Sequence, residues 1–174
     1  MNKILSAILA LCMIVSVTAC SSGNESSVPE EVKGSEDRTM REMTTQELIE
    51  DMGLGINLGN TFESCGNWIN KSSVTNYETA WGSPVITEQM IKGYKDCGFG
   101  VMRLPVAWSN MMDKETYTIN PDYMARVKEV LNWALDSDLY VILNIHYDNG
   151  WFSGFADDKK RDECFKKYEA IWKQ

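Results

Sequence analysis

The chain has 174 residues, 44% hydrophobic and 24% charged, a balance typical of a folded protein and not of a disordered chain or a many-pass membrane protein. Its 17 Lys and Arg against 25 Asp and Glu give a net charge of -8, which disfavours nucleic acid as a partner because binding phosphates needs a basic face. The single histidine, His146, excludes a zinc site built from several imidazoles, and we expect neither a metal nor another cofactor.

The first 19 residues have the pattern of a bacterial secretion signal. Lys3 precedes an apolar run, residues 4–17, that has the length of a signal-peptide core and is short for a membrane span. The run ends in VTAC, residues 17–20, which resembles a lipobox, where cleavage before the cysteine leaves a thiol that carries lipid. The alternative is an ordinary secretory cleavage site that contains Cys20 by chance. We expect a secreted protein that is held at the bacterial cell surface, its membrane contact being a lipid anchor on Cys20.

The segment after the signal, residues 20–41, is predicted to be a flexible tether. It is rich in Gly, Ser and Glu and nearly free of large apolar side chains, so it cannot bury enough surface to offset the entropy of ordering. The remaining residues, 42–174, are the predicted folded domain. No disulfide framework is indicated there, and Cys97 and Cys164 are predicted to be small core residues of helices.

From Thr44 onward the sequence alternates helix and strand signals. Capping residues mark three helix starts, at Thr44, Thr87 and Asn120, and Gly98 ends the second helix. Three apolar runs are predicted strands: residues 53–58, 99–106 and 139–145, the last covered on both faces. A final helix is predicted over residues 157–174, with Phe165, Tyr168, Ile171 and Trp172 on one side.

This alternation predicts an α/β fold with a parallel sheet. Polar residues stand at or just past the ends of the three strands, at Asn60, Arg103 and His146, as in a (β/α)8 TIM barrel or an open doubly wound sheet. The first strand is not followed by a glycine-rich phosphate loop, which favours the barrel. Because a whole barrel needs roughly 200 to 250 residues, we expect residues 42–174 to hold only about its first three βα units, as in a truncated product.

Four segments stand out in order along the chain: GINLGNT at 55–61, ETAWGSP at 78–84, RLPV at 103–106 and LYVILNIH at 139–146. Together they resemble glycoside hydrolase family five, the cellulase family A, and in order and spacing its bacterial endoglucanases, xyloglucanases and lichenases. The resemblance implies a retaining endo-β-1,4-glucanase-type hydrolase in a (β/α)8 barrel. Its partner would be a plant cell-wall β-glucan polysaccharide, and its process the catabolism of such polysaccharides.

The resemblance also implies two catalytic glutamates, an acid/base at the end of strand four and a nucleophile at the end of strand seven. Neither strand is among the predicted units, and the Asn-Glu-Pro motif that usually carries the first glutamate does not occur in this sequence. Retention requires two carboxyl groups about 5–5.5 Å apart. We therefore expect this chain to lack both glutamates and to be inactive alone.

Arg103 and His146 are the predicted supporting catalytic residues. A charged Arg103 inside an apolar run needs a facing carboxylate, and the resemblance implies that it lowers the pKa of the nucleophile; a structural ion pair is the alternative. His146 is expected to contact a sugar hydroxyl, the alternative being a satisfied core histidine. The family segment reads Asn-Ile-His-His-Asp, and here Tyr147 replaces the second His, so we expect altered sugar binding. Asp148 is expected to hold the loop.

The predicted substrate-binding residues lie at strand exits and are Asn60, Trp81, Trp108, Tyr147 and Trp151. Indole faces stack on the apolar faces of glucose rings, and ordinary packing is the alternative for each tryptophan. Asn57, within a strand, is expected to support the backbone. A function of another class is also open, a non-catalytic surface glycan-binding lipoprotein that keeps the aromatic cleft and lacks the acids. An inactive truncated product is the third reading.

Overall fold

The computed structural model describes residues 42–174. The predicted signal peptide, the lipidation site Cys20 and the tether lie outside the described residues. Within the described range, the helices are too short or too polar for any of them to be a candidate membrane span.

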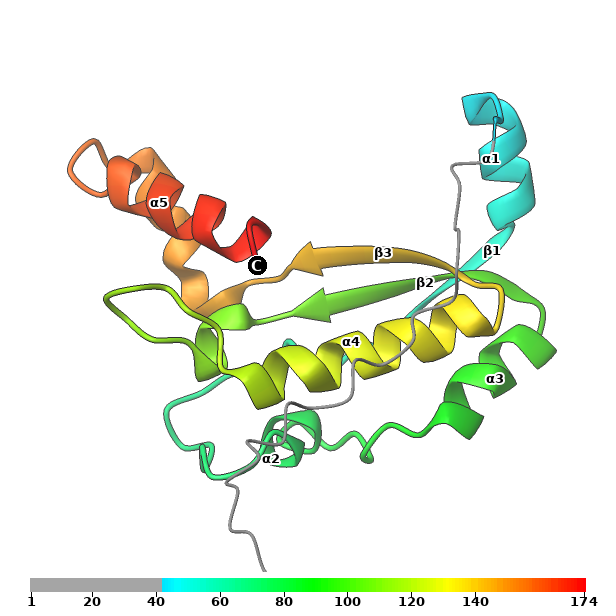
Figure 1. The fold of residues 1–174 in the computed structure, drawn as a ribbon, viewed down its shortest axis with the longest axis horizontal. Helices are drawn as coiled ribbons and strands as arrows, with labels where there is room; N and C mark the ends of the chain where they lie inside the picture. Colours follow the sequence, from blue (N-terminus) through cyan, green and yellow to red (C-terminus); the bar gives the residue numbers. More distant parts are fainter. Residues whose placement is uncertain (1–41) are drawn as a thin grey trace, which may run out of the picture. The chain divides into compact units, whose positions relative to one another are not determined.

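Helices and strands alternate along the described residues, as the sequence predicts (Figure 1). In chain order the elements are α1 Thr45–Met52, β1 Leu54–Asn57, α2 Thr75–Glu78, α3 Glu88–Asp96, β2 Phe99–Val106, η1 Trp108–Met111, α4 Pro121–Asp136, β3 Tyr140–Ile145, η2 Asp148–Ala156 and α5 Arg161–Trp172, where η marks a 3-10 helix. The strands form one parallel sheet in the order β1-β2-β3.

The three predicted helix starts are confirmed by hydrogen bonds of the capping side chains. Thr44 accepts from the amide of Glu47 at 3.3 Å, and the Glu47 carboxylate accepts from the amide of Thr44 at 2.7 Å, which completes a capping box. Thr87 caps α3 by accepting from the amide of Met90, and Asn120 caps α4 by accepting from the amides of Asp122 and Tyr123. Gly98, with φ +88°, follows α3 in the left-handed region that favours glycine, so the predicted end of that helix is also confirmed.

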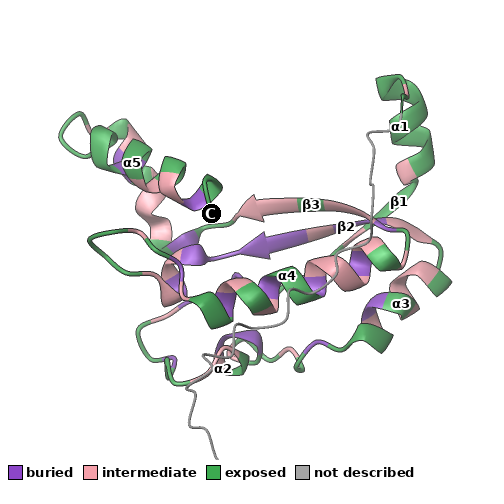
Figure 2. Ribbon diagram, viewed as in Figure 1, coloured by how far each residue is buried: buried purple, intermediate pink, exposed green. Residues whose placement is uncertain are grey.

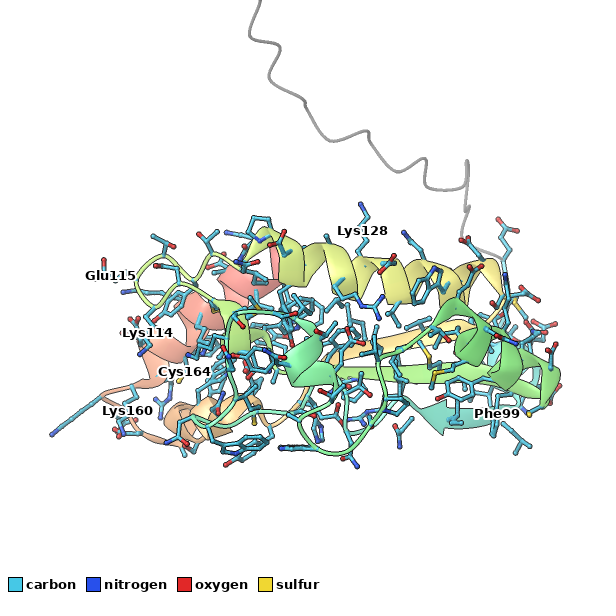
Figure 3. The ribbon with its side chains drawn as sticks, turned by 90° about the horizontal axis from the view of Figure 1, so that it is seen from below. Phe99, Lys114, Glu115, Lys128, Lys160 and Cys164 are labelled. Atoms are coloured by element: carbon cyan, nitrogen blue, oxygen red, sulfur yellow. The ribbon has the colours of Figure 1, made fainter. Side chains whose placement is uncertain are left out.

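One face of the sheet is closed by α3 and α4 (Figure 2). On this face Met102, Leu104 and Val106 of β2 are all 0% exposed, and they share a core cluster with apolar side chains of both helices. The side of α4 away from the sheet carries Lys128, which points outward (Figure 3). Burial of this apolar face contributes to the stability of the described fold.

The opposite face of the sheet is largely uncovered within the described residues, although Val101 and Pro105 of the central strand are buried on it. Ile142 of β3 is 46% exposed and Asn57 of β1 is exposed as well. The prediction that the third strand is covered on both faces is therefore wrong for the described part of the chain. The continuous apolar run indicates a strand, but the layer that covers each face comes from other segments.

The last helix also differs from its prediction. α5 begins at Arg161 and not at residue 157, because residues 157–160 form a bend and a turn. The 3-10 segment η2, Asp148–Ala156, precedes them and was not predicted. On α5 only Ile171 and Cys164 are buried, whereas the predicted apolar side exposes Phe165 at 56%, Tyr168 at 44% and Trp172 at 46%. Cys97 is exposed, so its prediction as a core residue is wrong; it lies at the C-cap of α3, past the turns that pack on the sheet.

Candidate functional site

The carboxyl edge of the sheet brings together two of the residues that the sequence singles out. Asn57, Arg103 and Ile142 are aligned across the three parallel strands, so their side chains share the open face. The Arg103 guanidinium donates to Asn57 Oδ1 at 3.1 Å, and its second nitrogen lies 2.9 Å from Nδ1 of His146. Arg103 and His146 are therefore neighbours, and Asn57, which the sequence assigned to backbone support, is part of the same cluster.

The contact with Arg103 fixes the hydrogen-bonding roles of the imidazole. A guanidinium can only donate, so Nδ1 of His146 accepts, and a neutral imidazole then carries its proton on Nε2. His146 is exposed, and within residues 42–174 the hydrogen bond of its ring is the one at Nδ1. The alternative of a satisfied core histidine does not fit these surroundings.

The charge of Arg103 has no carboxylate partner in the cluster. Within residues 42–174 the guanidinium of Arg103 hydrogen-bonds to the side-chain oxygen of Asn57 and to the imidazole of His146. A structural ion pair is therefore not what holds Arg103 in the described part of the chain. The guanidinium remains able to stabilise a negative group placed over this edge.

Three further predicted residues present exposed side chains near the strand exits. Tyr147 is 62% exposed and directly follows His146, and Trp81 is 41% exposed in the loop after α2. Asn60 is also exposed, with φ +58°. The Ser83 hydroxyl donates to the carbonyl of Gly59 at 3.3 Å, which ties the Trp81 loop to the exit of β1 beside Asn60.

Trp108 does not have the surroundings of a sugar platform. It is 3% exposed in η1, and its ring packs edge-on against Tyr123 with centroids 6.1 Å apart. The prediction of a substrate contact is wrong for Trp108, and the packing alternative holds. The chain turns inward directly after β2, so a strand-exit position does not by itself put the indole in solvent.

The Trp151 ring is engaged by its own chain. It stacks on Phe152 with centroids 4.1 Å apart, and the Lys167 ammonium lies 4.7 Å from the ring centroid. The indole N–H donates to Asp148 at 2.7 Å. These contacts with η2 and α5 engage parts of the indole that sugar stacking would use, and the sugar-binding role of Trp151 stays a prediction.

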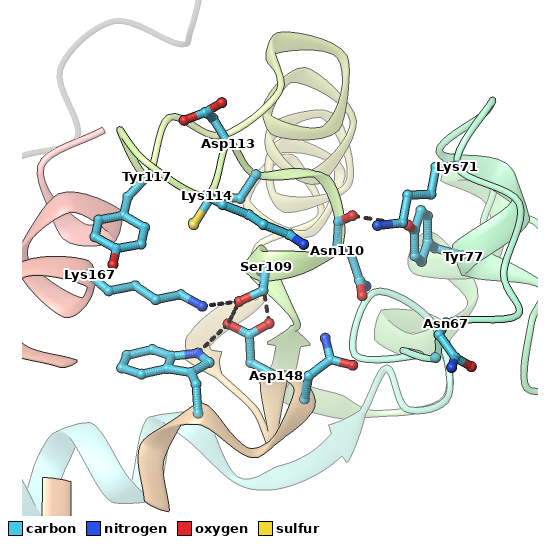
Figure 4. A pocket seen from close by; sticks show the side chains of 14 residues that line it. Asn67, Lys71, Tyr77, Ser109, Asn110, Asp113, Lys114, Tyr117, Asp148 and Lys167 are labelled. Carbon is cyan, nitrogen blue, oxygen red and sulfur yellow. Dashed lines mark hydrogen bonds between the residues drawn. The ribbon is translucent and has the colours of Figure 1, made fainter. Parts of the chain in front are cut away.

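A cavity of about 320 Å³ lies beside the exits of β2 and β3 and is lined by Ser109, Asp148 and Lys167 among others (Figure 4). Asp148 is 0% exposed and accepts from the amide of Ser109 at 2.8 Å, from its hydroxyl at 3.0 Å and from Trp151. Lys167 donates to the Ser109 hydroxyl. Asp148 thus holds its loop, as the sequence predicts. Its hydrogen bonds with Ser109, and the contact of Lys167 with the same serine, could not be predicted from the sequence.

Burial perturbs both charged groups of this cavity. Desolvation raises the pKa of Asp148, while its hydrogen bonds and the Lys167 charge act against that rise. Desolvation lowers the pKa of Lys167, and the charge of Asp148 opposes the change. No group of three or more His, Cys, Asp or Glu side chains suited to a metal ion occurs within residues 42–174.

Comparison with known proteins gives a consistent match. The family described as "Cellulase (glycosyl hydrolase family 5)" matches residues 62–174. The xyloglucan-specific endo-β-1,4-glucanase BoGH5A of Bacteroides ovatus is 40% identical over 138 residues, which is 78% of this chain and 27% of that protein. Endoglucanase B of Clostridium cellulovorans is 34% identical over 136 residues, 78% of this chain and 28% of that protein.

Solved structures agree with the sequence match. A broad-specificity endoglucanase from Ruminococcus champanellensis with bound cellotriose gives a TM-score of 0.69 at 36% identity, over 76% of this chain and 38% of that chain. A lichenase from Caldicellulosiruptor sp. F32 gives a TM-score of 0.69 at 31% identity, over 85% of this chain and 39% of that chain. The chain therefore spans well under half the length of each of these relatives.

Proposed function

The chain belongs to glycosyl hydrolase family 5, and on that premise we propose that it is part of a retaining endo-β-1,4-glucanase that cleaves plant cell-wall β-glucans. The described residues hold three βα units of the (β/α)8 barrel of that family. Active sites of such barrels lie at the carboxyl ends of the strands. The edge formed by Asn57, Arg103 and His146 is therefore the proposed active-site edge.

The observation that carries the proposal is the Arg103 guanidinium, held by two neutral groups. In the proposed mechanism Arg103 faces the nucleophilic glutamate of the complete enzyme and lowers its pKa, so the nucleophile stays ionised. His146 donates from Nε2 to a hydroxyl of the sugar beside the cleaved bond. The exposed Trp81 and Tyr147 offer aromatic faces to neighbouring sugars.

We propose that this chain is inactive by itself, because its buried carboxylates have other partners. Glu63 accepts from the amides of Asn60 and Thr61, and Glu78 is paired with Arg126. Asp148 is bound to Ser109 and Trp151. The buried carboxylates of residues 42–174 are therefore engaged within the chain, which supports the proposal that the carboxyl couple of the two-step retaining mechanism lies elsewhere.

The proposed substrate is the β-1,4-linked glucan backbone. The relatives are described as xyloglucan-specific, lichenase or of broad specificity, and a β-glucan backbone is common to these substrates. A lipid anchor on Cys20 and a place at the cell surface are proposed from the VTAC segment alone.

The first test uses the chain alone with a soluble β-glucan. We expect no release of reducing ends, and release would contradict the proposal that the catalytic carboxylates lie elsewhere. Retardation of the chain in a gel that contains β-glucan would support an exposed sugar-binding edge. Such binding by itself is also what a glycan-binding lipoprotein would show.

The second test separates these two functions. Residues 42–174 replace the aligned segment of the Ruminococcus champanellensis endoglucanase, and hydrolysis of β-glucan is measured. We expect an active chimera that loses about 10²-fold or more in kcat on Arg103→Ala, whereas Arg161→Ala, which removes an arginine with surface partners, leaves kcat unchanged. A folded chimera without hydrolysis would favour the binding protein.

A further inference from the structure

The backbone that follows β3 is strained. Tyr147, Asp148 and Asn149 have φ values of +50°, +49° and +61°, and Gly150 continues the run at +75°. Non-glycine side chains rarely adopt such values, and three in succession persist only where surrounding contacts enforce them. The sharp turn is closed by the amide of Gly150, which donates to the carbonyl of Tyr147 at 2.7 Å.

The turn lies directly beside the proposed sugar-facing residues. The amide of His146 donates to the carbonyl of Val106 at 3.0 Å, which continues the pairing of β2 and β3 up to the turn. The direction of the backbone after that bond sets where the His146 imidazole meets Arg103 and where the Tyr147 ring is exposed. Anything that enforces the turn therefore also sets the pose of both side chains.

The enforcing contacts come from Asp148. Its carboxylate is fully buried and reaches across to η1, where it accepts both the amide and the hydroxyl of Ser109. It also accepts the indole N–H of Trp151 further along η2. The exits of two neighbouring strands are thereby joined through one carboxylate, and Lys167 donates to the same serine from α5.

Burying the Asp148 carboxylate costs free energy, which indicates that its hydrogen bonds form a specific arrangement. A carboxylate without exposure has lost its hydration, and charge-assisted hydrogen bonds from amide, hydroxyl and indole donors offset part of that loss in this geometry. Asp148 itself lies within the strained run, so relaxing the backbone would break all three bonds. The strained backbone after β3 and the hydrogen bonds of the Asp148 carboxylate therefore depend on each other.

We propose that Asp148, held by Ser109, is a positioning residue that fixes the turn after β3 and so keeps His146 and Tyr147 in place on the sugar-facing edge. The sugar-facing role of that edge rests on the proposed function. The positioning itself concerns only contacts within this chain, so the two parts can fail separately.

The single histidine of the chain makes the test direct, since all imidazole NMR signals belong to His146. The full chain is compared with Asp148→Asn, which removes the charge, and with Ser109→Ala. The second change removes the hydroxyl that donates to Asp148 and accepts from Lys167, and it keeps the backbone donor. Asp113→Asn is the matched control, because Asp113 also holds a turn by accepting from the amides of Glu115 and Thr116. Thermal unfolding of each variant is recorded in parallel.

We expect Asp148→Asn to shift the imidazole resonances, Ser109→Ala to shift them in the same direction by less, and Asp113→Asn to leave them in place. Unshifted resonances in a folded Asp148→Asn variant would overturn the proposal, as would an equal shift in the control. If Asp148→Asn unfolds the chain, Ser109→Ala decides: a shift supports the positioning role and no shift refutes it.

Gel retardation by soluble β-glucan supplies the second readout. We expect Asp148→Asn to weaken retardation several-fold and Asp113→Asn to leave it unchanged. If the wild-type chain is not retarded while the imidazole shifts appear as expected, the positioning role stands and the sugar-binding role of the edge fails.

Discussion

The two faces of the sheet differ in cover and in composition. Towards α3 and α4, the side chains of Met102, Leu104 and Val106 are fully buried and apolar. Between them in the same strand, Arg103 points to the other face and joins Asn57 and His146 in a polar cluster. The alternation of a single strand thus separates residues that stabilise the fold from residues that the proposed chemistry needs.

This separation means that substitutions on the two faces should have different consequences. Changes on the helix-covered side should lower the free energy of unfolding, because they leave cavities or unpaired charges. Changes on the open side should alter binding and catalysis with little effect on stability. The four predictions below test this comparison.

The largest expected effect concerns the ion pair between Arg126 of α4 and Glu78 of α2. Arg126 of α4 donates to Glu78 at 2.7 Å and 3.0 Å, and Glu78 is 0% exposed. We expect Arg126→Met to lower the free energy of unfolding by about 3–5 kcal/mol, because it leaves a buried carboxylate unpaired. Urea unfolding measures the change. Lys92→Met removes an exposed partner of Glu88 and should cost less than about 0.5 kcal/mol; equal losses would refute the distinction.

A matched pair of apolar truncations compares the two faces directly. Leu104→Ala should cost about 2–5 kcal/mol, since Leu104 is 0% exposed and the change leaves a cavity. Ile142→Ala in the neighbouring strand should stay within about 1 kcal/mol, because Ile142 is 46% exposed. Both are measured by urea unfolding of the full chain. A large loss for Ile142→Ala would mean that the open face is covered in solution.

Tyr123 tests a polar contact inside the covered core. Its hydroxyl donates to the carbonyl of Phe62 at 2.9 Å and lies 3.3 Å from that of Ala107, and the side chain is fully buried. Tyr123→Phe should cost about 1–3 kcal/mol, because buried carbonyls lose a donor. Tyr147→Phe on the exposed Tyr147 should leave the urea midpoint unchanged. Equal midpoints for the two variants would show that the hydroxyl of Tyr123 is replaceable by water.

The smallest expected effect is a pH dependence of the free energy of unfolding that comes from Asp148, just after β3. Because burial raises the pKa of Asp148, its contribution to stability is complete below the ordinary carboxyl pKa and is lost as the pH rises through the folded-state pKa. The positive charge of Lys167 opposes the rise in the pKa of Asp148. We expect Lys167→Met to raise the pKa of Asp148 further, so that stability continues to fall to a higher pH than in the wild type.

Urea midpoints between about pH 4 and pH 7 measure this effect, a window that begins at the ordinary carboxyl pKa. Lys166→Met is the matched control, since Lys166 is exposed and pairs with Glu163. Superimposable pH profiles for Lys167→Met and Lys166→Met would contradict the assigned role of Lys167.

Element positions could be predicted well because their signals are local. The run 99–106 is β2 to the residue, and Thr44, Thr87 and Asn120 cap the helices that they were predicted to cap. A cap or an apolar run acts through hydrogen bonds and packing within a few residues, so the sequence carries the information directly. The family resemblance read from four short segments is confirmed by the match over residues 62–174.

Side-chain surroundings could be predicted only in part. Arg103 and His146 were singled out by their positions at strand exits, and they do meet. The same reasoning failed for Trp108, which is buried against Tyr123, and it did not predict that the Trp151 ring contacts Phe152 and Lys167. A position after a strand indicates which edge of the sheet a residue occupies, but not the direction of its side chain.

The sequence by itself determined the order of the three strands and of the longer helices, the parallel sheet and the family, since each depends on neighbouring residues or on motif spacing. Only the tertiary structure decided that Asn57 joins Arg103, that Ser109 and Trp151 hold Asp148, and that one face of the sheet is open. Except for the local bond between Trp151 and Asp148, those contacts join strands and loops that are far apart in the chain. Their partners are set by strand register and by the course of the loops, which no local pattern encodes.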